Sequence, residues 1–172
     1  CASSQHQRLF DRDRFGMGVE TAGCLKCGFI FINPRPTVDA MSSFYRDHYR
    51  DFYEAIETPT AEYIAKGPFE ERARFVIDKI MSQVSSESGT TLDIGCSEGT
   101  FLKRFHQHFP SWESYGLEPD PQFAKFAKDN SGAKDVFNSD FQEFFSSCSD
   151  RFDLITLSHV LEHLLQPLDD LK

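Results

Sequence analysis

Two glycines bracket a short polar loop, Asp93-Ile94-Gly95-Cys96-Ser97-Glu98-Gly99-Thr100, that directly follows a run of mostly β-forming residues. Glycine lets the backbone turn sharply and approach a ligand closely, as a nucleotide-type cofactor requires at this position. The loop lacks the G-x-G-x-x-G order of dinucleotide sites, and Glu98 would place a negative charge where a pyrophosphate would have to bind. It therefore favours a cofactor without phosphate.

A carboxylate follows the next expected strand, in the run Tyr115-Gly116-Leu117-Glu118-Pro119-Asp120. Glu118 lies 23 residues beyond Gly95, close to the interval of about 20 residues at which an acid reaches a ribose diol. We therefore expect Glu118 to accept the hydroxyls of a ribose.

Two histidines flank an acid near the end of the sequence, because His159, Glu162 and His163 are spaced i, i+3 and i+4. On a helix these three would share one face. Imidazole titrates near neutrality, so we expect His159 or His163 to remove a proton from an acceptor, with helix-end packing as an equal alternative. The H-x-x-E-H pattern also matches inverted zinc peptidases, which would need a further ligand downstream.

A C-x2-C pair, Cys24 and Cys27, precedes Gly28 near the start of the sequence. Two thiolates at this spacing can bind one zinc ion, and a structural zinc site needs four ligands. We predict Cys1 as the third ligand, with His6 as the fallback. The alternative is a reduced, metal-free thiol pair in a hairpin.

The elements that must position the loop and the carboxylate alternate along the second half of the sequence. Apolar residues at 3- and 4-residue steps predict a helix that opens at Pro68. After it we expect strands at 91–94, 114–117, 135–137 and 152–157, and helices at 100–109, 121–129, from 141 and from 159. Strand followed by helix four times predicts a doubly wound α/β fold whose mostly parallel sheet carries helices on both faces and binds ligands beyond the strands' carboxyl ends.

The first third of the sequence consists of two segments that differ in amino-acid composition. Residues 1–36 are rich in cysteine and turn residues and predict a small zinc-binding hairpin module that ends at Asn33-Pro34-Arg35-Pro36. Residues 37–67 are aromatic and charged and predict a linker or lid, partly helical. Phe44, Tyr45 and Tyr49 could line an acceptor pocket, although helix packing is the commoner role of such aromatics. Residues 68–172 form the predicted cofactor-binding domain.

Composition also disfavours two classes of partner, nucleic acids and membranes. The 172 residues include 27 acidic and 18 basic side chains, a formal charge of −9 that repels nucleic-acid phosphates. No apolar run approaches the roughly 18 residues of a membrane span. Five cysteines, an odd number, favour a reduced compartment, so we expect a cytoplasmic protein with no nucleic-acid or membrane partner. A start at Cys1 and an end at Lys172 suggest a fragment of a longer protein.

The motifs resemble those of class I S-adenosylmethionine-dependent methyltransferases. Residues 92–99 (LDIGCSEG), 115–120 (YGLEPD), 138–141 (NSDF) and 152–163 (FDLITLSHVLEH) are similar to that family's four motifs, in the same order. The cysteine module, with the Asn-Pro-Arg-Pro exit, is similar to a zinc module that precedes methyltransferases of sugars and other small metabolites. The family normally has further strands after the fourth, and many members have glycine where this chain has Ser97.

The resemblance implies a Rossmann-like methyltransferase domain and a structural zinc ion. S-adenosylmethionine would be the methyl donor, and a small, perhaps sugar-like, molecule the acceptor. It places Asp93, Gly95 and Gly99 at the cofactor's methionine end, Glu118 at its ribose, and Asp140 with Phe141 at its adenine. The predicted cofactor-binding residues are Asp93, Gly95, Cys96, Ser97, Gly99, Glu118, Pro119, Asp140, Phe141 and Ser158.

Three alternatives stay open. Residues 95–99 also read as the G-x-S-x-G elbow of a serine hydrolase, although no oxyanion-loop motif precedes them. The chain could instead be a catalytically incomplete fragment that binds the cofactor without turnover. Singly, the site residues also have structural explanations, because Glu118 or Asp120 could cap the helix at Pro121 and Asp140 with Glu143 could form a capping box.

Overall fold

The computed structural model describes residues 3–13, 15–53 and 55–171. The chain divides into two compact units, Cys1–Val38 and Asp39–Lys172. The first holds a three-stranded antiparallel sheet in which β2 (Thr21–Cys24) pairs with both β1 (His6–Phe10) and β3 (Ile30–Ile32). The Cys24–Gly28 turn joins β2 to β3, so the expected hairpin is present as part of a three-stranded meander.

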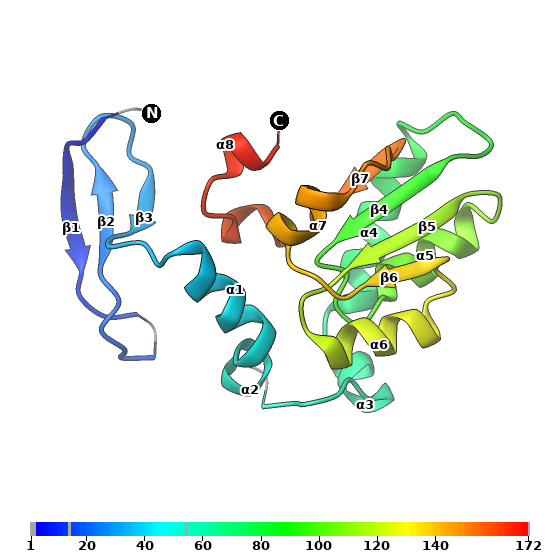
Figure 1. The fold of residues 1–172 in the computed structure, drawn as a ribbon, viewed down its shortest axis with the longest axis horizontal. Helices are drawn as coiled ribbons and strands as arrows, with labels where there is room; N and C mark the ends of the chain where they lie inside the picture. Colours follow the sequence, from blue (N-terminus) through cyan, green and yellow to red (C-terminus); the bar gives the residue numbers. More distant parts are fainter. Residues whose placement is uncertain (1–2, 14, 54, 172) are drawn as a thin grey trace. The chain divides into compact units, whose positions relative to one another are not determined.

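The second unit contains a four-stranded parallel sheet in the order β6-β5-β4-β7 (Figure 1). The strands are β4 (Thr90–Ile94), β5 (Glu113–Leu117), β6 (Asp135–Phe137) and β7 (Leu154–Thr156). β4, the first of these four strands in the sequence, is an inner strand, and its neighbours β5 and β7 run parallel to it. The prediction of an α/β fold with a parallel sheet is confirmed.

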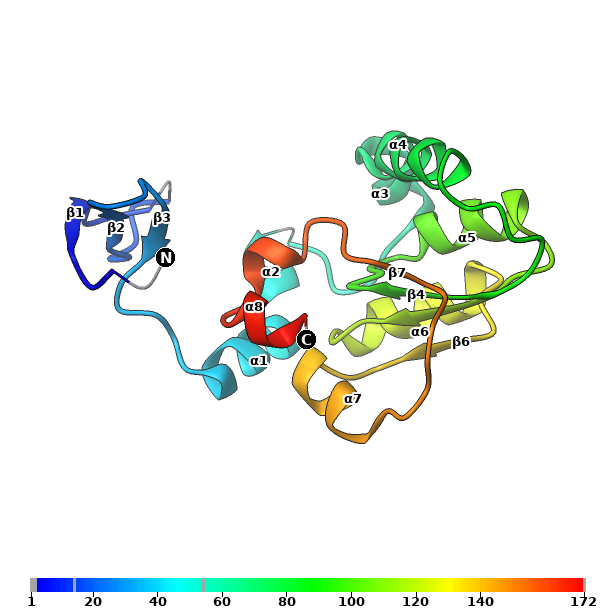
Figure 2. The ribbon, with the colours of Figure 1, turned by 90° about the horizontal axis from the view of Figure 1, so that it is seen from above.

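Helices cover both faces of this sheet (Figure 2). On one face α4 (Phe69–Met81), α5 (Thr100–His108) and α6 (Pro121–Asn130) bury Ile77, Leu102, Phe105 and Ala127. On the other face α7 (Phe141–Ser147) packs Phe144 against Leu92, Ile94 and Leu117. Strand residues therefore alternate between two apolar layers, as expected when both faces of a parallel sheet are covered.

The aromatic segment is helical, as predicted for part of it. It forms α1 (Val38–Asp47), α2 (Tyr49–Tyr53) and α3 (Ala61–Lys66). Phe44, Tyr45 and Tyr49 contact one another, with ring centroids 5.0 to 6.1 Å apart. These contacts support the packing interpretation of the three aromatics.

The predicted helix from His159 onward is wrong. The segment contains a short 3-10 helix, η1 (Leu161–His163), and a single turn, α8 (Pro167–Asp170). His159 has a φ of +58°, which interrupts any helix there, and Pro167 disfavours helical geometry at Gln166. No described helix is long and apolar enough to cross a membrane.

Candidate functional site

The glycine loop connects β4 to α5 at the carboxyl end of the sheet. Gly95 and Gly99 have φ values of +71° and +82°, which favour glycine. A Cβ at Gly99 would lie 3.0 Å from the Ala127 Cβ and 3.1 Å from its Cα, so this glycine also lets α5 begin close to α6. Ser97 adopts a φ of +53° where a glycine would be unstrained.

Glu118 is held at the end of β5 by two backbone donors. Its Oε2 accepts from the Ser97 N–H at 3.0 Å and its Oε1 from the Asp120 N–H at 3.1 Å. Because a carboxylate oxygen has two acceptor sites, each oxygen keeps capacity for one further hydroxyl. The loop after β4 and the carboxylate after β5 are therefore one connected structure, as the sequence spacing predicts.

An arginine that the sequence did not single out lies against Glu118. Arg50, on α2, places its Nη2 3.6 Å from Glu118 Oε1 and donates to Ser97 Oγ at 3.0 Å. The two side chains are only 11% and 5% exposed. The Arg50 guanidinium stacks 3.8 Å above the buried ring of Phe123. No spacing rule signals this pairing across 68 residues of sequence.

Four carboxylates are buried around this point: Asp93, Glu98, Glu118 and Asp120. Burial raises the pKa of Asp93 to about 7, although its Oδ1 accepts a 2.6 Å hydrogen bond from Thr156 Oγ1. Burial also raises the pKa of Glu118, opposed by the Arg50 charge and by the Asp120 and Ser97 N–H groups. Glu98 Oε2 is buried without a hydrogen-bond partner in the described part of the chain. Such a site suits a positively charged ligand.

The structural roles expected for Asp120 and Asp140 are present. Asp120 Oδ1 caps α6 by accepting from the Gln122 and Phe123 N–H groups. Asp140 Oδ1 caps α7 by accepting from the Glu143 N–H, whereas the Glu143 side chain accepts from Ser139 Oγ, so only half of a capping box forms. In each aspartate the capping hydrogen bonds use a single carboxylate oxygen, Oδ1.

The remaining predicted cofactor residues surround the same loops. Cys96 is buried, and burial raises the pKa of its thiol. Pro119 is half-buried and linked to the end of β6 by the Asn138 side chain, which donates to its carbonyl at 2.8 Å. Phe141 begins α7, its ring 4.7 Å from that of Phe145. Ser158 is exposed beyond β7.

The histidines after β7 do not share a helix face, contrary to the prediction. His159 is exposed and its Nδ1 lies 3.5 Å from Glu162 Oε1. The Nδ1 of His163 is 2.8 Å from the Tyr45 hydroxyl on α1. Burial raises the pKa of Tyr45, so the hydroxyl keeps its proton at neutral pH. Neither histidine contacts Ser97, whose hydroxyl accepts from Arg50, and the geometry therefore disfavours a serine hydrolase.

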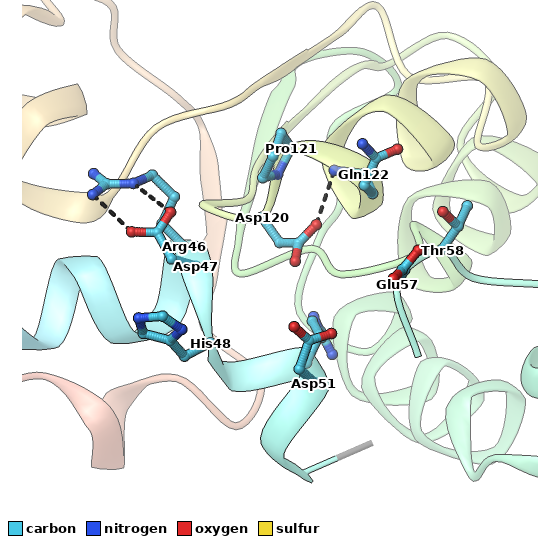
Figure 3. Close-up of a pocket in the computed structure, with 10 residues that line it drawn as sticks. Arg46, Asp47, His48, Asp51, Glu57, Thr58, Asp120, Pro121 and Gln122 are labelled. Carbon is cyan, nitrogen blue, oxygen red and sulfur yellow. Dashed lines mark hydrogen bonds and ion pairs between the residues drawn. The ribbon is translucent and has the colours of Figure 1, made fainter. Parts of the chain in front are cut away.

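A polar cavity of about 510 Å³ lies between the α1–α2 segment and the start of α6 (Figure 3). Arg50 lines this cavity and also lies 3.6 Å from Glu118. The other lining residues are Arg46, Asp47, His48, Asp51, Glu57, Thr58, Asp120, Pro121 and Gln122.

The cysteine turn has part of the donor set of a zinc site. The N–H groups of Cys27 and Lys26 lower the pKa of Cys24, which favours its thiolate. The Gly28 N–H donates to the Cys24 carbonyl at 2.9 Å and closes the turn. Cys1 lies outside the described residues, and His6 engages Ser4 and Asn33 with its two ring nitrogens. Within residues 3–13, 15–53 and 55–171 no group of three or more potential ligands forms.

Comparison with known proteins finds similarity to methyltransferases. Residues 92–172 match the family model described as "Methyltransferase domain". The chain is 31% identical over 86 residues to 2-O-methyltransferase NoeI of Sinorhizobium fredii, a match that covers 50% of this chain and 31% of NoeI.

Two solved methyltransferase structures share the fold. The plantazolicin methyltransferase BpumL, in complex with S-adenosylhomocysteine (SAH), has a TM-score of 0.55 and 18% identity over 77% of this chain and 50% of its own. Magnesium protoporphyrin IX methyltransferase (ChlM) of Synechocystis PCC 6803, with bound SAM, has a TM-score of 0.53 and 12% identity over 81% of this chain and 72% of its own. The chain thus spans about a third of the length of NoeI and half that of BpumL.

Proposed function

We propose that residues 68–172 bind S-adenosylmethionine and that the protein transfers its methyl group to a small-molecule acceptor. The observation that carries this proposal is the Glu118 carboxylate, fixed beside the glycine loop by two backbone N–H groups with acceptor capacity left on both oxygens. The buried carboxylates Asp93 and Glu98 suit a cofactor with a positive charge. The methyltransferase-domain match over residues 92–172 supports the same conclusion.

In this site Glu118 would accept the ribose hydroxyls, and Asp93 with residues 95–99 would border the methionine end. Asp140, Phe141 and Pro119 would contact the adenine, and Ser158 would lie beside the cofactor after the fourth strand. S-adenosylmethionine supplies an electrophilic methyl group when bound. The protein's contribution is alignment of donor and acceptor, which accelerates such a transfer strongly.

The acceptor is a hydroxyl-bearing, sugar-like small molecule in this proposal. The relative named as a 2-O-methyltransferase supports an oxygen acceptor. The acidic net charge disfavours a nucleic-acid acceptor. His163 or His159 would take the hydroxyl proton, and the 2.8 Å contact with Tyr45 would fix the orientation of the His163 ring.

The N-terminal unit would bind one structural zinc ion through Cys24, Cys27 and Cys1. The lowered pKa of Cys24 and the tight turn at Gly28 support this assignment. The metal would stabilise the three-stranded sheet and has no step in methyl transfer.

Calorimetric titration with SAH tests the cofactor site. We expect micromolar binding by the chain and a loss of about tenfold or more in Glu118→Gln, which weakens charged hydrogen bonds to the ribose. Glu113→Gln is the matched control, because Glu113 lies at the other end of β5 in an exposed ion pair with Lys134. Equal affinity of the two variants for SAH would contradict the assignment of Glu118 to the cofactor ribose.

A further inference from the structure

Two histidines follow β7 on a segment that touches the glycine loop. A Cβ at Gly95 would lie 2.5 Å from Val160 Cγ2, so Val160 packs directly against the proposed methionine end of the cofactor site. His159 precedes Val160, and the His163 N–H donates to the Val160 carbonyl at 2.8 Å. Both histidines are exposed, so an acceptor that approaches the cofactor from this side meets two imidazoles.

The Tyr45 hydroxyl determines which nitrogen of the neutral His163 ring carries the proton. It lies 2.8 Å from Nδ1, and His163 is its one hydrogen-bond partner among the described residues. Because Tyr45 is half-buried, donation by the phenol is the arrangement that leaves its proton with an acceptor. The ring then carries its own proton on Nε2. His163 can therefore donate a hydrogen bond from Nε2, but it has no lone pair there to take a proton.

His159 faces a carboxylate instead of a phenol. Its Nδ1 lies 3.5 Å from Glu162 Oε1. A carboxylate on this side favours the tautomer with the proton on Nδ1, which leaves a lone pair on Nε2, and it stabilises the imidazolium that forms when Nε2 takes a proton. His159 also has a φ of +58°, a conformation that residues other than glycine adopt rarely and that is enriched at functional sites.

We propose that the two histidines have different roles: His159 takes the hydroxyl proton of the acceptor, and His163 donates a hydrogen bond from Nε2 to a second acceptor oxygen. This inference rests on the proposed methyl transfer. As the acceptor oxygen bonds to the methyl carbon, the bond from that carbon to the sulfonium sulfur breaks and the O–H proton passes to His159 Nε2. The products are a methyl ether, SAH and an imidazolium that pairs with Glu162. Glu162 and Tyr45 are positioning residues.

Long-range proton–nitrogen NMR spectra of the isotope-labelled chain, recorded at about pH 8, where free imidazole is neutral, test the tautomers without an acceptor. We expect the proton of His159 on Nδ1 and that of His163 on Nε2. Glu162→Ala should shift the His159 proton toward Nε2, because the carboxylate that holds it on Nδ1 is removed. Tyr45→Phe should convert His163 into a mixture of tautomers.

Two variants control for indirect effects on these spectra. Glu87→Ala removes an acid from an exposed loop, and Tyr115→Phe removes a hydroxyl that donates to Glu113. Neither should change the tautomer of either histidine. The same tautomer in His159 and His163 of the unaltered chain, or the reverse of the expected pair, would overturn the inference.

Methyl transfer to methyl β-D-glucopyranoside, a neutral sugar probe, tests the two roles in catalysis. We expect His159→Gln to lower kcat by about 100-fold, the usual cost of losing a general base, with KM little changed. His163→Gln should mainly raise KM, by about 3- to 10-fold, the loss of one hydrogen bond. The opposite split would overturn the inference, and retained SAH binding shows that the variants are folded. If the unaltered chain bound SAH but methylated no probe, the sugar-like acceptor of the proposed function would fail, and the tautomers would still decide between the histidines.

Discussion

Asp93 is a buried acid whose ionised form destabilises the fold. It lies on β4, one residue before the strand ends, beside Thr156 of β7, whose hydroxyl donates to it at 2.6 Å. Burial is the largest influence on its pKa and raises it to about 7, and the nearby charges of Glu98 and Glu118 act in the same direction. At pH 8 the folded protein therefore holds a carboxylate that burial disfavours.

This perturbation predicts a pH-dependent difference between Asp93→Asn and the unaltered chain. An unfolded Asp ionises near pH 3.8, whereas the folded Asp93 keeps its proton to about pH 7. The contribution of Asp93 to stability is thus full below pH 3.8 and is lost as pH rises to about 7. We expect urea denaturation to show Asp93→Asn gaining free energy of unfolding relative to the parent between pH 4 and pH 7, then a plateau. If the free energies of unfolding of the variant and the parent changed in parallel with pH, the raised pKa of Asp93 would be contradicted.

Residues differ in how far sequence could place them. Glu118 was predictable, because strand spacing and the glycine loop bring a carboxylate after β5 to the carboxyl end of β4. Arg50 was not, because its contact with Glu118 depends on how α2 packs over the sheet. The pairing of His163 with Tyr45 was hidden for the same reason. Roles that arise from long-range packing leave no local pattern.

At the scale of the elements, the glycine before α5 has two roles. It adopts a backbone conformation that other residues rarely adopt, and it lets two helices approach closely. Gly99 combines a φ of +82° with a close approach to α6, where an added Cβ would lie 3.0 Å from the Ala127 Cβ and 3.1 Å from its Cα. Gly132 has a similar φ of +78°, but a Cβ there would meet only the His106 ring, at 3.2 Å. The two positions therefore differ in their close neighbour, which is helix backbone at Gly99 and an exposed side chain at Gly132.

We expect Gly99→Ala to lower the free energy of unfolding by about 2 to 4 kcal/mol, and Gly132→Ala by about 1 to 2 kcal/mol. Both variants carry the left-handed strain, and only the first also pushes α5 away from Ala127. Chemical denaturation monitored by circular dichroism measures the difference. Equal losses would show that the α5–α6 approach adds nothing to the cost at Gly99.

The α6 cap gives an independent element-scale prediction. Asp120 Oδ1 accepts from both the Gln122 and Phe123 N–H groups. Asp120→Ala should cost about 1 to 2 kcal/mol of stability, and Asp120→Asn should retain most of it, because an amide oxygen can still cap the helix. A thermal or urea unfolding series of the two variants checks this order, and the reverse order would contradict the capping role.

Element types were predictable from sequence where periodicity and caps agree. Phe69, Ala73, Val76, Ile77 and Ile80 predict α4, and the β4 to β6 run follows from apolar stretches separated by helices. The prediction of a helix from His159 onward was wrong, although the spacing of apolar residues there is typical of a helix. The positive φ of His159 and the position of Pro167 limit that segment to short turns.

At the scale of the whole molecule, we propose that the two units have separate functions, zinc binding and cofactor binding. Cysteines of the first unit would bind zinc, whereas the predicted cofactor residues all lie in the second, Asp39–Lys172. We expect Cys24→Ser to lower the zinc content measured by mass spectrometry and to leave the dissociation constant for SAH unchanged within about twofold. Full zinc content in that variant would contradict the role of Cys24 as a zinc ligand. A large loss of SAH affinity would contradict the proposal that zinc binding and cofactor binding belong to separate units.

Hydrogen–deuterium exchange of the chain with and without SAH tests the central claim most directly, because it locates the ligand. The proposed site predicts slower exchange in peptides covering residues 95–100, 118–122 and 138–142, and no change in peptides covering residues 6–32. Protection confined to other segments, or none at saturating SAH, would contradict a cofactor site at the carboxyl ends of β4 and β5.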